Sequence, residues 1–96
     1  MAIPLEACKH RGVYRIKARN ITIGVFDEPW KTFIGIREKW GRRFLDREYH
    51  WDCGPPHGTA TPLEELPVTL PEDMGLDTRD PATHDKLFAW LDEYKP

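Results

Sequence analysis

The segment GVYRIKARNITIGVF, residues 12–26, decides the fold. Apolar and cationic side chains alternate along its first half, with Tyr14, Ile16 and Ala18 on one side and Arg15, Lys17 and Arg19 on the other. Such alternation is typical of a half-buried β-strand, because successive side chains of a strand point to opposite faces. Asn20 accepts the left-handed backbone of a tight turn, and the alternation resumes through residues 21–25. The segment therefore predicts two antiparallel strands whose exposed face carries positive charge.

Two further strands follow this pair. KTFIGIREKW (31–40) is rich in β-branched and aromatic residues, and a turn at DEPW (27–30) precedes it. A turn around Gly41 leads into RRFLDREYHWD (42–52), where the apolar positions change phase, which predicts a β-bulge. Four consecutive strands with short connections predict an antiparallel meander over residues 12–52.

Two glycines interrupt the predicted strands and indicate curvature. Gly24 and Gly35 lie in mid-strand positions, where strong bending or the close approach of another backbone favours a residue without a side chain. We therefore expect a small curved antiparallel sheet or an SH3-like open barrel of four to five strands. Such barrels bind nucleic acids, peptides or enzymes, so the fold alone selects no function.

The chain after residue 52 changes character. Five prolines between residues 53 and 71 exclude long regular elements. Thr61 is a suitable N-cap, and Pro62 suits the first position of a helix. We therefore expect a Pro-rich loop over residues 53–79 that contains one or two short helical turns.

One longer helix is predicted at the end of the chain, over residues 80–95. Asp80 is a suitable N-cap before Pro81. The apolar residues that recur at helical spacing are Leu87, Trp90, Leu91 and Tyr94. This amphipathic helix is expected to cover the sheet. The predicted fold class is α+β, mainly β.

Length and composition bound the class of protein. Ninety-six residues with 40% hydrophobic content suffice for one compact domain spanning residues 1–96. No apolar run approaches the roughly eighteen residues that indicate a membrane-spanning helix, and the start of the chain lacks the apolar segment of a signal peptide. We therefore expect a cytoplasmic protein that does not enter a membrane, in which Cys8 and Cys53 remain reduced thiols.

The net charge of −2 conceals two opposite halves. Residues 1–47 hold eleven Lys or Arg against five acids, whereas residues 48–96 hold three against eleven. Either the acidic half folds back and neutralises the basic half, or a basic face remains for an anionic partner. A plain solvated face is the third interpretation.

The segment EYHWDCGPPHGTATP, residues 48–62, concentrates chemically active side chains. With the start of the chain it offers a set of zinc-ligating residue types: Cys8, His10, His50, Cys53 and His57. A paired C-x-x-C is missing, so we expect turn residues and a buried thiol in place of a metal site. The segment is then a stiff exit turn after the last strand of the meander, pinned by hydrogen bonds.

Catalysis finds little support in the residues. Cys53 and His57 are suitable types for a nucleophile and a base, but their spacing on a Pro-Pro turn does not favour in-line attack. The sequence contains neither G-x-x-x-x-G-K nor G-x-G-x-x-G, the two glycine-rich motifs that bind phosphates. We therefore expect no enzyme activity, no cofactor and no bound metal.

A binding face is the remaining interpretation. Arginine forks recognise phosphate or carboxylate and stack on aromatic rings, and the cations of three adjacent strands are interleaved with aromatic residues, including Trp40 and Trp51. The candidate binding residues are Arg15, Lys17, Arg19, Arg37, Lys39, Arg42, Arg43, Arg47, Tyr49, His50, Asp52 and His57.

Several motifs resemble a family of small uncharacterised proteins encoded by tailed bacteriophages of actinobacteria. The shared pattern has YRI and RN in the first strand, then GV, FIGIREK, G-x-R, EYHWD and a G-x-P-x-GT turn. It falls on Tyr14, Arg15, Ile16, Arg19, Asn20, Gly24, Val25, residues 33–39, Gly41, Arg43, residues 48–52, Gly54 and Gly58. The resemblance covers about half the chain and implies a viral accessory protein located in the host cytoplasm.

The leading functional prediction is a non-catalytic phage protein that binds a host protein or nucleoprotein complex. By analogy with other phage proteins of this size, it would inhibit a host defence system such as CRISPR. The alternative is nucleic-acid or nucleotide binding through the arginine-rich strand face. Either a monomer or a homodimer is compatible with the sequence.

Overall fold

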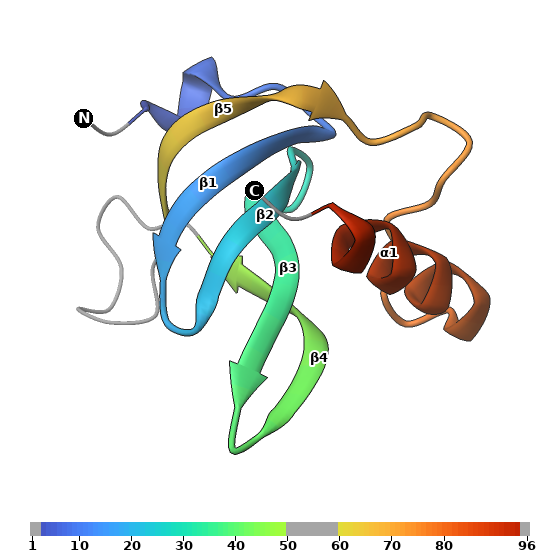
Figure 1. The fold of residues 1–96 in the computed structure, drawn as a ribbon. Coiled ribbons are helices and arrows are strands. Elements are labelled where there is room, and N and C mark those ends of the chain that lie inside the picture. Colours follow the sequence, from blue (N-terminus) through green and yellow to red (C-terminus); the bar gives the residue numbers. More distant parts are fainter. Residues whose placement is uncertain (1–2, 50–59, 95–96) are drawn as a thin grey trace.

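The computed structural model describes residues 3–49 and 60–94. Its elements are a short 3₁₀ helix η1 (Leu5–Ala7), strands β1 (Gly12–Ala18), β2 (Ile21–Asp27), β3 (Thr32–Lys39), β4 (Arg42–Tyr49) and β5 (Thr61–Thr69), and helix α1 (Pro81–Glu93). The strands form one antiparallel sheet in the order β4-β3-β2-β1-β5 (Figure 1). No helix of the described residues is long and apolar enough to span a membrane.

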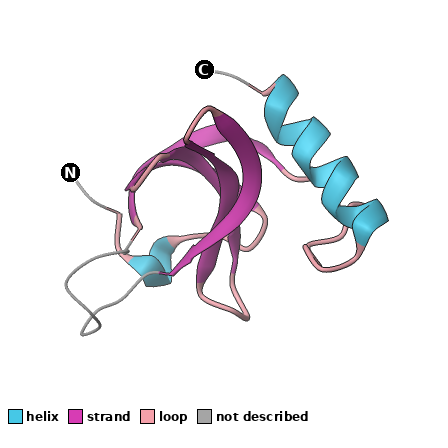
Figure 2. Cartoon of the chain, turned by 90° about the horizontal axis from the view of Figure 1, so that it is seen from below, coloured by secondary structure: helices cyan, strands magenta, loops and turns pink. Residues whose placement is uncertain are grey.

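The predicted meander is confirmed for the described residues, because each strand from β1 to β4 pairs with the next one along the chain. Asn20 provides the tight turn between β1 and β2 with a φ of 59°. The sheet curls strongly without closing, and α1 lies outside the curl (Figure 2). The predicted fold class, α+β and mainly β with one C-terminal helix, is confirmed.

The prediction of a Pro-rich loop with short helical turns at Thr61 and Pro62 is wrong for residues 61–69, because this segment forms β5. The strand pairs with β1, from Lys17 opposite Thr61 to Gly12 opposite Thr69. Proline has no N–H to donate, but an edge strand tolerates it, particularly at a bulge. Pro67 lies in the stretch where the register shifts between Gly12 and Tyr14 of β1. The unpaired edge of β1 thus outweighs the local capping signal.

The bulge predicted in residues 42–52 is absent from the described part of that segment. The pairing of β3 with β4 is regular from Thr32 opposite Tyr49 to Lys39 opposite Arg42. The apolar positions of this segment change phase without a bulge, because Leu45 is buried while Phe44, on the opposite face, is 37% exposed. The irregular pairings occur in β1 instead.

Apolar side chains pack on both faces of the curled sheet. Inside the curl, Phe33 contacts Tyr14 edge to face at 6.0 Å between ring centroids and Phe26 at 5.0 Å. On the outer face the buried cluster consists of Val13, Val25, Ile34, Leu45, Leu70, Leu87 and Leu91. The central strands are therefore buried on both sides, and α1 supplies the cover on the outside.

Gly24 and Gly35 allow the curvature. They lie directly opposite each other on β2 and β3. A Cβ at Gly35 would lie 2.3 Å from the carbonyl oxygen of Ile23, and one at Gly24 would lie 2.9 Å from the Cβ of Phe33. Any side chain at this crossing would push the two strands apart.

Helix α1 begins as predicted. The Asp80 carboxylate accepts hydrogen bonds from the Thr83 N–H at 3.3 Å and the Thr83 hydroxyl at 2.7 Å, and Pro81 opens the first turn. Leu87 and Leu91 are buried against the sheet. Burying each leucine side chain stabilises the docked helix by about 1.5–3 kcal/mol.

Candidate binding site at the hairpin end

The acidic half of the chain neutralises part of the basic half. Lys9 pairs with Glu65 at 3.4 Å and Arg15 with Glu64 at 3.1 Å, so β5 supplies acids to the region around β1. From α1, the Asp92 carboxylate binds the Arg43 guanidinium, which also lies over the ring of Phe88. Arg15 and Arg43, two of the predicted binding residues, are therefore held in ion pairs within the chain.

Arg37 is a structural residue. Its side chain is 10% exposed and binds Asp46 at 2.8 Å and Glu48 at 2.9 Å. It also donates a hydrogen bond to the Arg19 carbonyl oxygen, which ties the β1–β2 turn to β3. Two carboxylates and a carbonyl satisfy the buried guanidinium, so Arg37 is not available to a partner.

Arg47 has a similar internal role on the outer face. It donates to the Asp27 carboxylate at 2.7 Å, the Thr32 hydroxyl at 2.8 Å and the Leu76 carbonyl oxygen at 2.8 Å. These bonds join β4, the end of β2 and the segment that leads to α1. The guanidinium also lies 5.6 Å from the ring centroid of Trp30.

The remaining predicted cations lie near the end of β1, in the β1–β2 turn and at the tip of the β3–β4 hairpin. Within the described residues, Lys17, Arg19, Lys39 and Arg42 make no ion pair with an acid. Lys39 and Arg42 lie directly opposite each other at the tip of the β3–β4 hairpin. The β1–β2 turn adjoins them, because the Glu38 N–H donates to the Asn20 carbonyl oxygen at 3.1 Å.

We call these four cations and Trp40 the hairpin end. Trp40 occupies the turn itself and is 85% exposed. Its φ is 54°, and the following Gly41 has a φ of 71°. Two consecutive positive φ values suit a two-residue hairpin loop, in which Asn-Gly is the usual pair. The indole ring therefore projects from the tip, with the Lys39 ammonium 4.5 Å from its centroid.

Nothing in the described packing accounts for a tryptophan at this position. A positive φ strains a bulky side chain by about 1–3 kcal/mol. Like charges placed directly opposite on neighbouring strands, as in Lys39 and Arg42, are also unfavourable. A strained aromatic residue and two facing cations thus share one exposed tip, where a shallow depression is lined by Lys39, Trp40, Arg42, Arg43 and Phe44.

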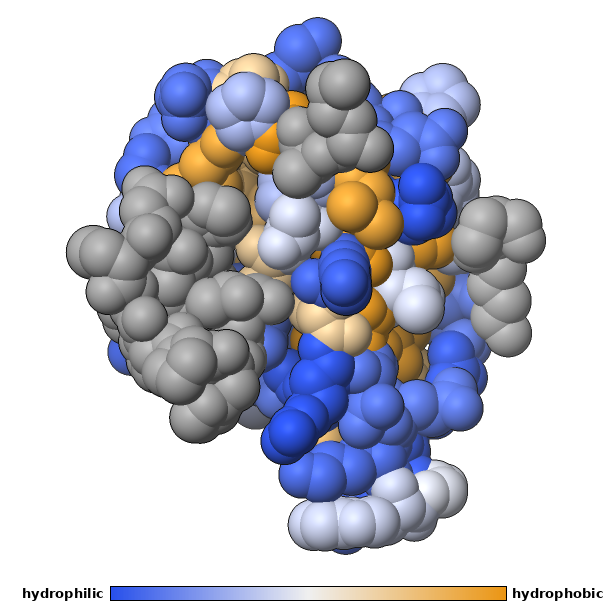
Figure 3. Space-filling model, turned by 90° about the vertical axis from the view of Figure 1, so that its left-hand side faces the viewer, coloured by the Kyte–Doolittle hydropathy of each residue, from blue (hydrophilic) through white to orange (hydrophobic). Residues whose placement is uncertain are grey.

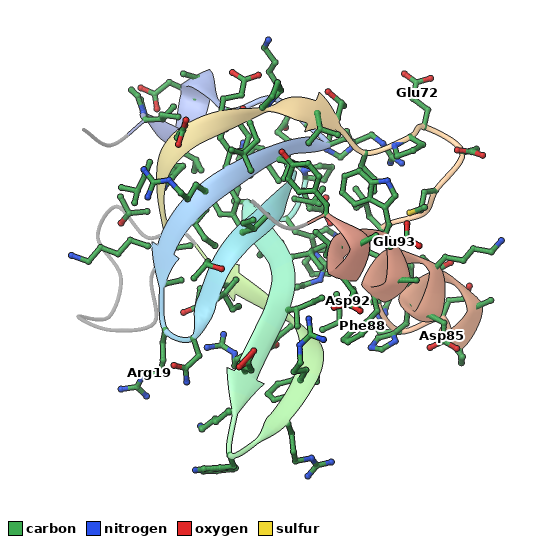
Figure 4. The ribbon with its side chains drawn as sticks, in the orientation of Figure 1. Arg19, Glu72, Asp85, Phe88, Asp92 and Glu93 are labelled. Atoms are coloured by element: carbon green, nitrogen blue, oxygen red, sulfur yellow. The ribbon has the colours of Figure 1, made fainter. Side chains whose placement is uncertain are left out.

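One exposed acid, Glu38, adjoins the hairpin end and faces Arg43 at 3.8 Å, whereas other exposed acids lie around α1. Figure 4 shows Arg19 beside the lower part of the sheet, whereas Glu72, Asp85 and Glu93 project around α1 and the segment before it. In Figure 3 the lower end of the molecule, where Figure 1 places the β3–β4 tip, is mostly hydrophilic. Glu72, Asp85 and Glu93 therefore lie on the side of the molecule away from Arg19.

Part of the predicted site cannot be compared with the structure. Tyr49 ends β4 opposite Thr32. The other three predicted residues beyond that strand, His50, Asp52 and His57, lie outside the described residues. Trp51 and Cys53 do so as well.

The candidate zinc ligands at the start of the chain have other partners. The Cys8 thiol is buried and donates to the Pro4 carbonyl oxygen at 3.7 Å. Burial, with a smaller contribution from Glu65, raises the pKa of Cys8 to about 11. His10 Nδ1 accepts a hydrogen bond from the Glu28 N–H at 3.1 Å. In residues 3–49 and 60–94, no three His, Cys, Asp or Glu side chains form a metal-binding group.

The importance of Trp40 was missed by the sequence interpretation, which treated it as an aromatic residue of a strand face or of the core. The signal was nevertheless present. A tryptophan immediately before the glycine of a two-residue hairpin loop cannot reach the core, because both loop residues lie beyond the last strand pair.

Comparison with known proteins adds little to this site. No family model matches the chain, and no solved structure matches it. Among curated proteins, the mitochondrial leucine–tRNA ligase of Saccharomyces cerevisiae is 30% identical over an 84-residue alignment that covers 77% of this chain and 9% of the ligase. The chain spans so small a share of the ligase that the similarity assigns it to no family.

Proposed function

We propose that this chain is a non-catalytic bacteriophage accessory protein that binds a host protein or nucleoprotein complex, such as a CRISPR effector, through its hairpin end. The observation that carries the proposal is Trp40, which is 85% exposed in a strained turn conformation. The phage origin and the host target rest on the sequence resemblance. The place of contact rests on the geometry of the tip.

The energetics of the tip favour a binding role. An exposed indole contributes nothing to the core, and its positive φ lowers the stability of the free protein. Tryptophan and arginine are the residues that most often carry the binding energy of an interface. Trp40 beside Arg42 and Lys39 therefore costs stability in the free chain and supplies an anchor in a complex.

The chemistry of the described residues supports binding over covalent catalysis. Thiolates are the reactive form of cysteine, and the raised pKa of Cys8 keeps this thiol protonated at neutral pH.

Capture of a partner from an actinobacterial lysate tests the proposal. Immobilised wild-type protein is expected to retain one dominant host component at low salt. Trp40→Ala and the double variant Lys39→Gln/Arg42→Gln are expected to lose it, because both remove the anchor of the hairpin end.

Two matched variants control for general effects. Trp30→Ala removes another exposed tryptophan, and Lys86→Gln removes an exposed cation on α1. Both are expected to retain the partner. Recovery of nothing by the wild type, or equal recovery by the hairpin-end variants, would overturn the proposal.

A further inference from the structure

We infer that the hairpin end binds single-stranded nucleic acid, with Trp40 stacking on an unpaired base and the four cations of the hairpin end contacting phosphates. The inference rests on the proposed function, because it names the component of the partner that this same end contacts. It also narrows the broad arginine-rich face to Lys17, Arg19, Lys39 and Arg42.

The placement of the cations around the ring supports this assignment. Lys39 and Arg42 flank Trp40 on both sides of the turn, as a direct cross-strand pair. The β1–β2 turn brings Arg19 next to the same strand through the hydrogen bond from Glu38 to Asn20. A nucleic-acid strand with one base stacked on the indole would therefore pass positive side chains on either side of that base.

The second argument is that these four cations form no ion pair with an acid among the described residues. Eight cations were candidates from the sequence, and Arg15, Arg37, Arg43 and Arg47 proved to have internal acidic partners. The other four have none among the described residues, so contact with phosphates would break no ion pair. Cations that form no internal ion pair bind a polyanion mainly by releasing its counterions.

A single-stranded nucleic acid matches both features of the tip better than other polyanions do. Each nucleotide supplies a flat ring and a phosphate, and base–aromatic stacking tolerates any sequence. An acidic protein surface offers carboxylates without a regular supply of stackable rings. A duplex keeps its bases stacked on one another, which leaves the indole without a free ring face. An anionic membrane requires a larger apolar surface than one indole and the partly exposed Phe44.

The acids around α1 favour the same orientation. Glu72, Asp85 and Glu93 lie away from Arg19 in Figure 4, on the side of α1. A polyanion is attracted by the cationic end and repelled by the acidic side, which steers the encounter toward the hairpin.

Fluorescence anisotropy with a labelled oligothymidylate of about 15 nucleotides tests the inference on the intact protein. Four phosphate contacts predict a slope of about −3 in a plot of log affinity against log salt for a single strand. Affinity should then fall about 50-fold between roughly 50 and 200 mM salt.

Substitutions separate stacking from charge. Trp40→Ala is expected to weaken binding about 10-fold without changing the salt slope, and Trp40→Phe should retain most of the affinity because a ring remains. Lys39→Gln and Arg42→Gln should each reduce the magnitude of the slope by about 0.7. Trp30→Ala and Lys86→Gln should change neither quantity.

The outcomes distinguish this inference from the proposed function. No anisotropy change at about 50 mM salt would overturn it, since electrostatic binding is strongest at low salt. If capture from the lysate still depended on Trp40, the proposed function would stand and the contact would be to protein. Equal affinity for duplex of the same length, or preferential binding to phosphatidylserine vesicles, would also overturn the single-strand assignment.

Discussion

At the scale of single residues, the arginines divide into structural and available groups that look alike in the sequence. Arg37 and Arg47 point into polar networks made by the strands themselves. Arg19 and Arg42 have no acidic partner in the described part of the chain. This division limits the candidate site to one end of the sheet.

Replacing Arg37 by methionine should destabilise the fold by about 3–5 kcal/mol, because Glu48, whose side chain is 9% exposed, would retain an uncompensated buried charge. Urea unfolding followed by circular dichroism measures the loss. Arg15→Met is the matched control, since its ion pair with Glu64 is half exposed and should be worth less than about 1 kcal/mol. A double variant Arg37→Met/Glu48→Leu should recover most of the stability. Equal losses for Arg37→Met and Arg15→Met would contradict the structural role of Arg37.

Replacing Trp40 should stabilise the protein, in contrast to replacing Arg37. Trp40→Asn is expected to raise the free energy of unfolding by about 1 kcal/mol, because asparagine accepts the positive φ that strains tryptophan. The same change should weaken oligonucleotide binding about 10-fold, as expected for Trp40→Ala, because both remove the stacking ring. Trp30→Asn is the control, since Trp30 does not have a positive φ and should gain no stability. Thermal unfolding of the two variants measures the change in stability. A destabilised Trp40→Asn protein would show that the indole supports the fold.

At the scale of elements, the curl of the sheet depends on the crossing of β2 and β3. Backbone to backbone contact at this point is so close that no side chain fits between Gly35 and Ile23. The pairing of β2 with β3 also places the β1–β2 turn beside the end of β3, where the Glu38 N–H donates to the Asn20 carbonyl oxygen. The cations of the two hairpins therefore lie on neighbouring strands whose pairing includes the Gly24–Gly35 crossing.

Two glycine-to-alanine changes separate steric from conformational effects. Gly35→Ala should cost about 2 kcal/mol or more, because its Cβ would lie 2.3 Å from the Ile23 carbonyl oxygen and the strands would have to shift. Gly41→Ala meets no atom within 4 Å, and its φ of 71° should cost only about 1 kcal/mol. Chemical denaturation of both variants measures the difference, and a larger loss at Gly41 would contradict the close approach at Gly35.

At the scale of the whole molecule, one sheet joins two apolar clusters. Residues inside the curl form the first, and the second joins the outer face to α1. Because Val13 and Tyr14 are neighbours on β1 yet belong to different clusters, the two cores share their backbone hydrogen bonds. We therefore expect the helix and the sheet to unfold together.

Leu87→Ala tests this coupling. The side chain is fully buried between α1 and the sheet, so its truncation should lower the stability of the entire domain by about 3 kcal/mol in a single transition. Lys86→Ala, one position earlier on the exposed side, should have an effect of less than about 0.5 kcal/mol. A Leu87→Ala protein with an unchanged melting temperature but an altered size-exclusion profile would show that the helix stripe joins two copies of the chain.

The sequence by itself determined the meander, the terminal helix with its Asp80 cap, and the need for glycine at positions 24 and 35. Alternation, turn chemistry and helix capping act between residues that are close in the chain, so they can be read locally. The cations of the candidate site were also identified from the sequence, although the key position of Trp40 was not.

Only the tertiary structure decided that residues 61–69 form a strand and which arginines remain free. The capping signal of Thr61 and Pro62 is a local preference of about 1 kcal/mol, and pairing with the open edge of β1 outweighs it. Likewise, the acids that engage Arg15 and Arg43 come from β5 and α1, far along the chain. Local preferences are weak compared with long-range pairing and burial, and therefore the last strand and the exact site emerge only when the chain is folded.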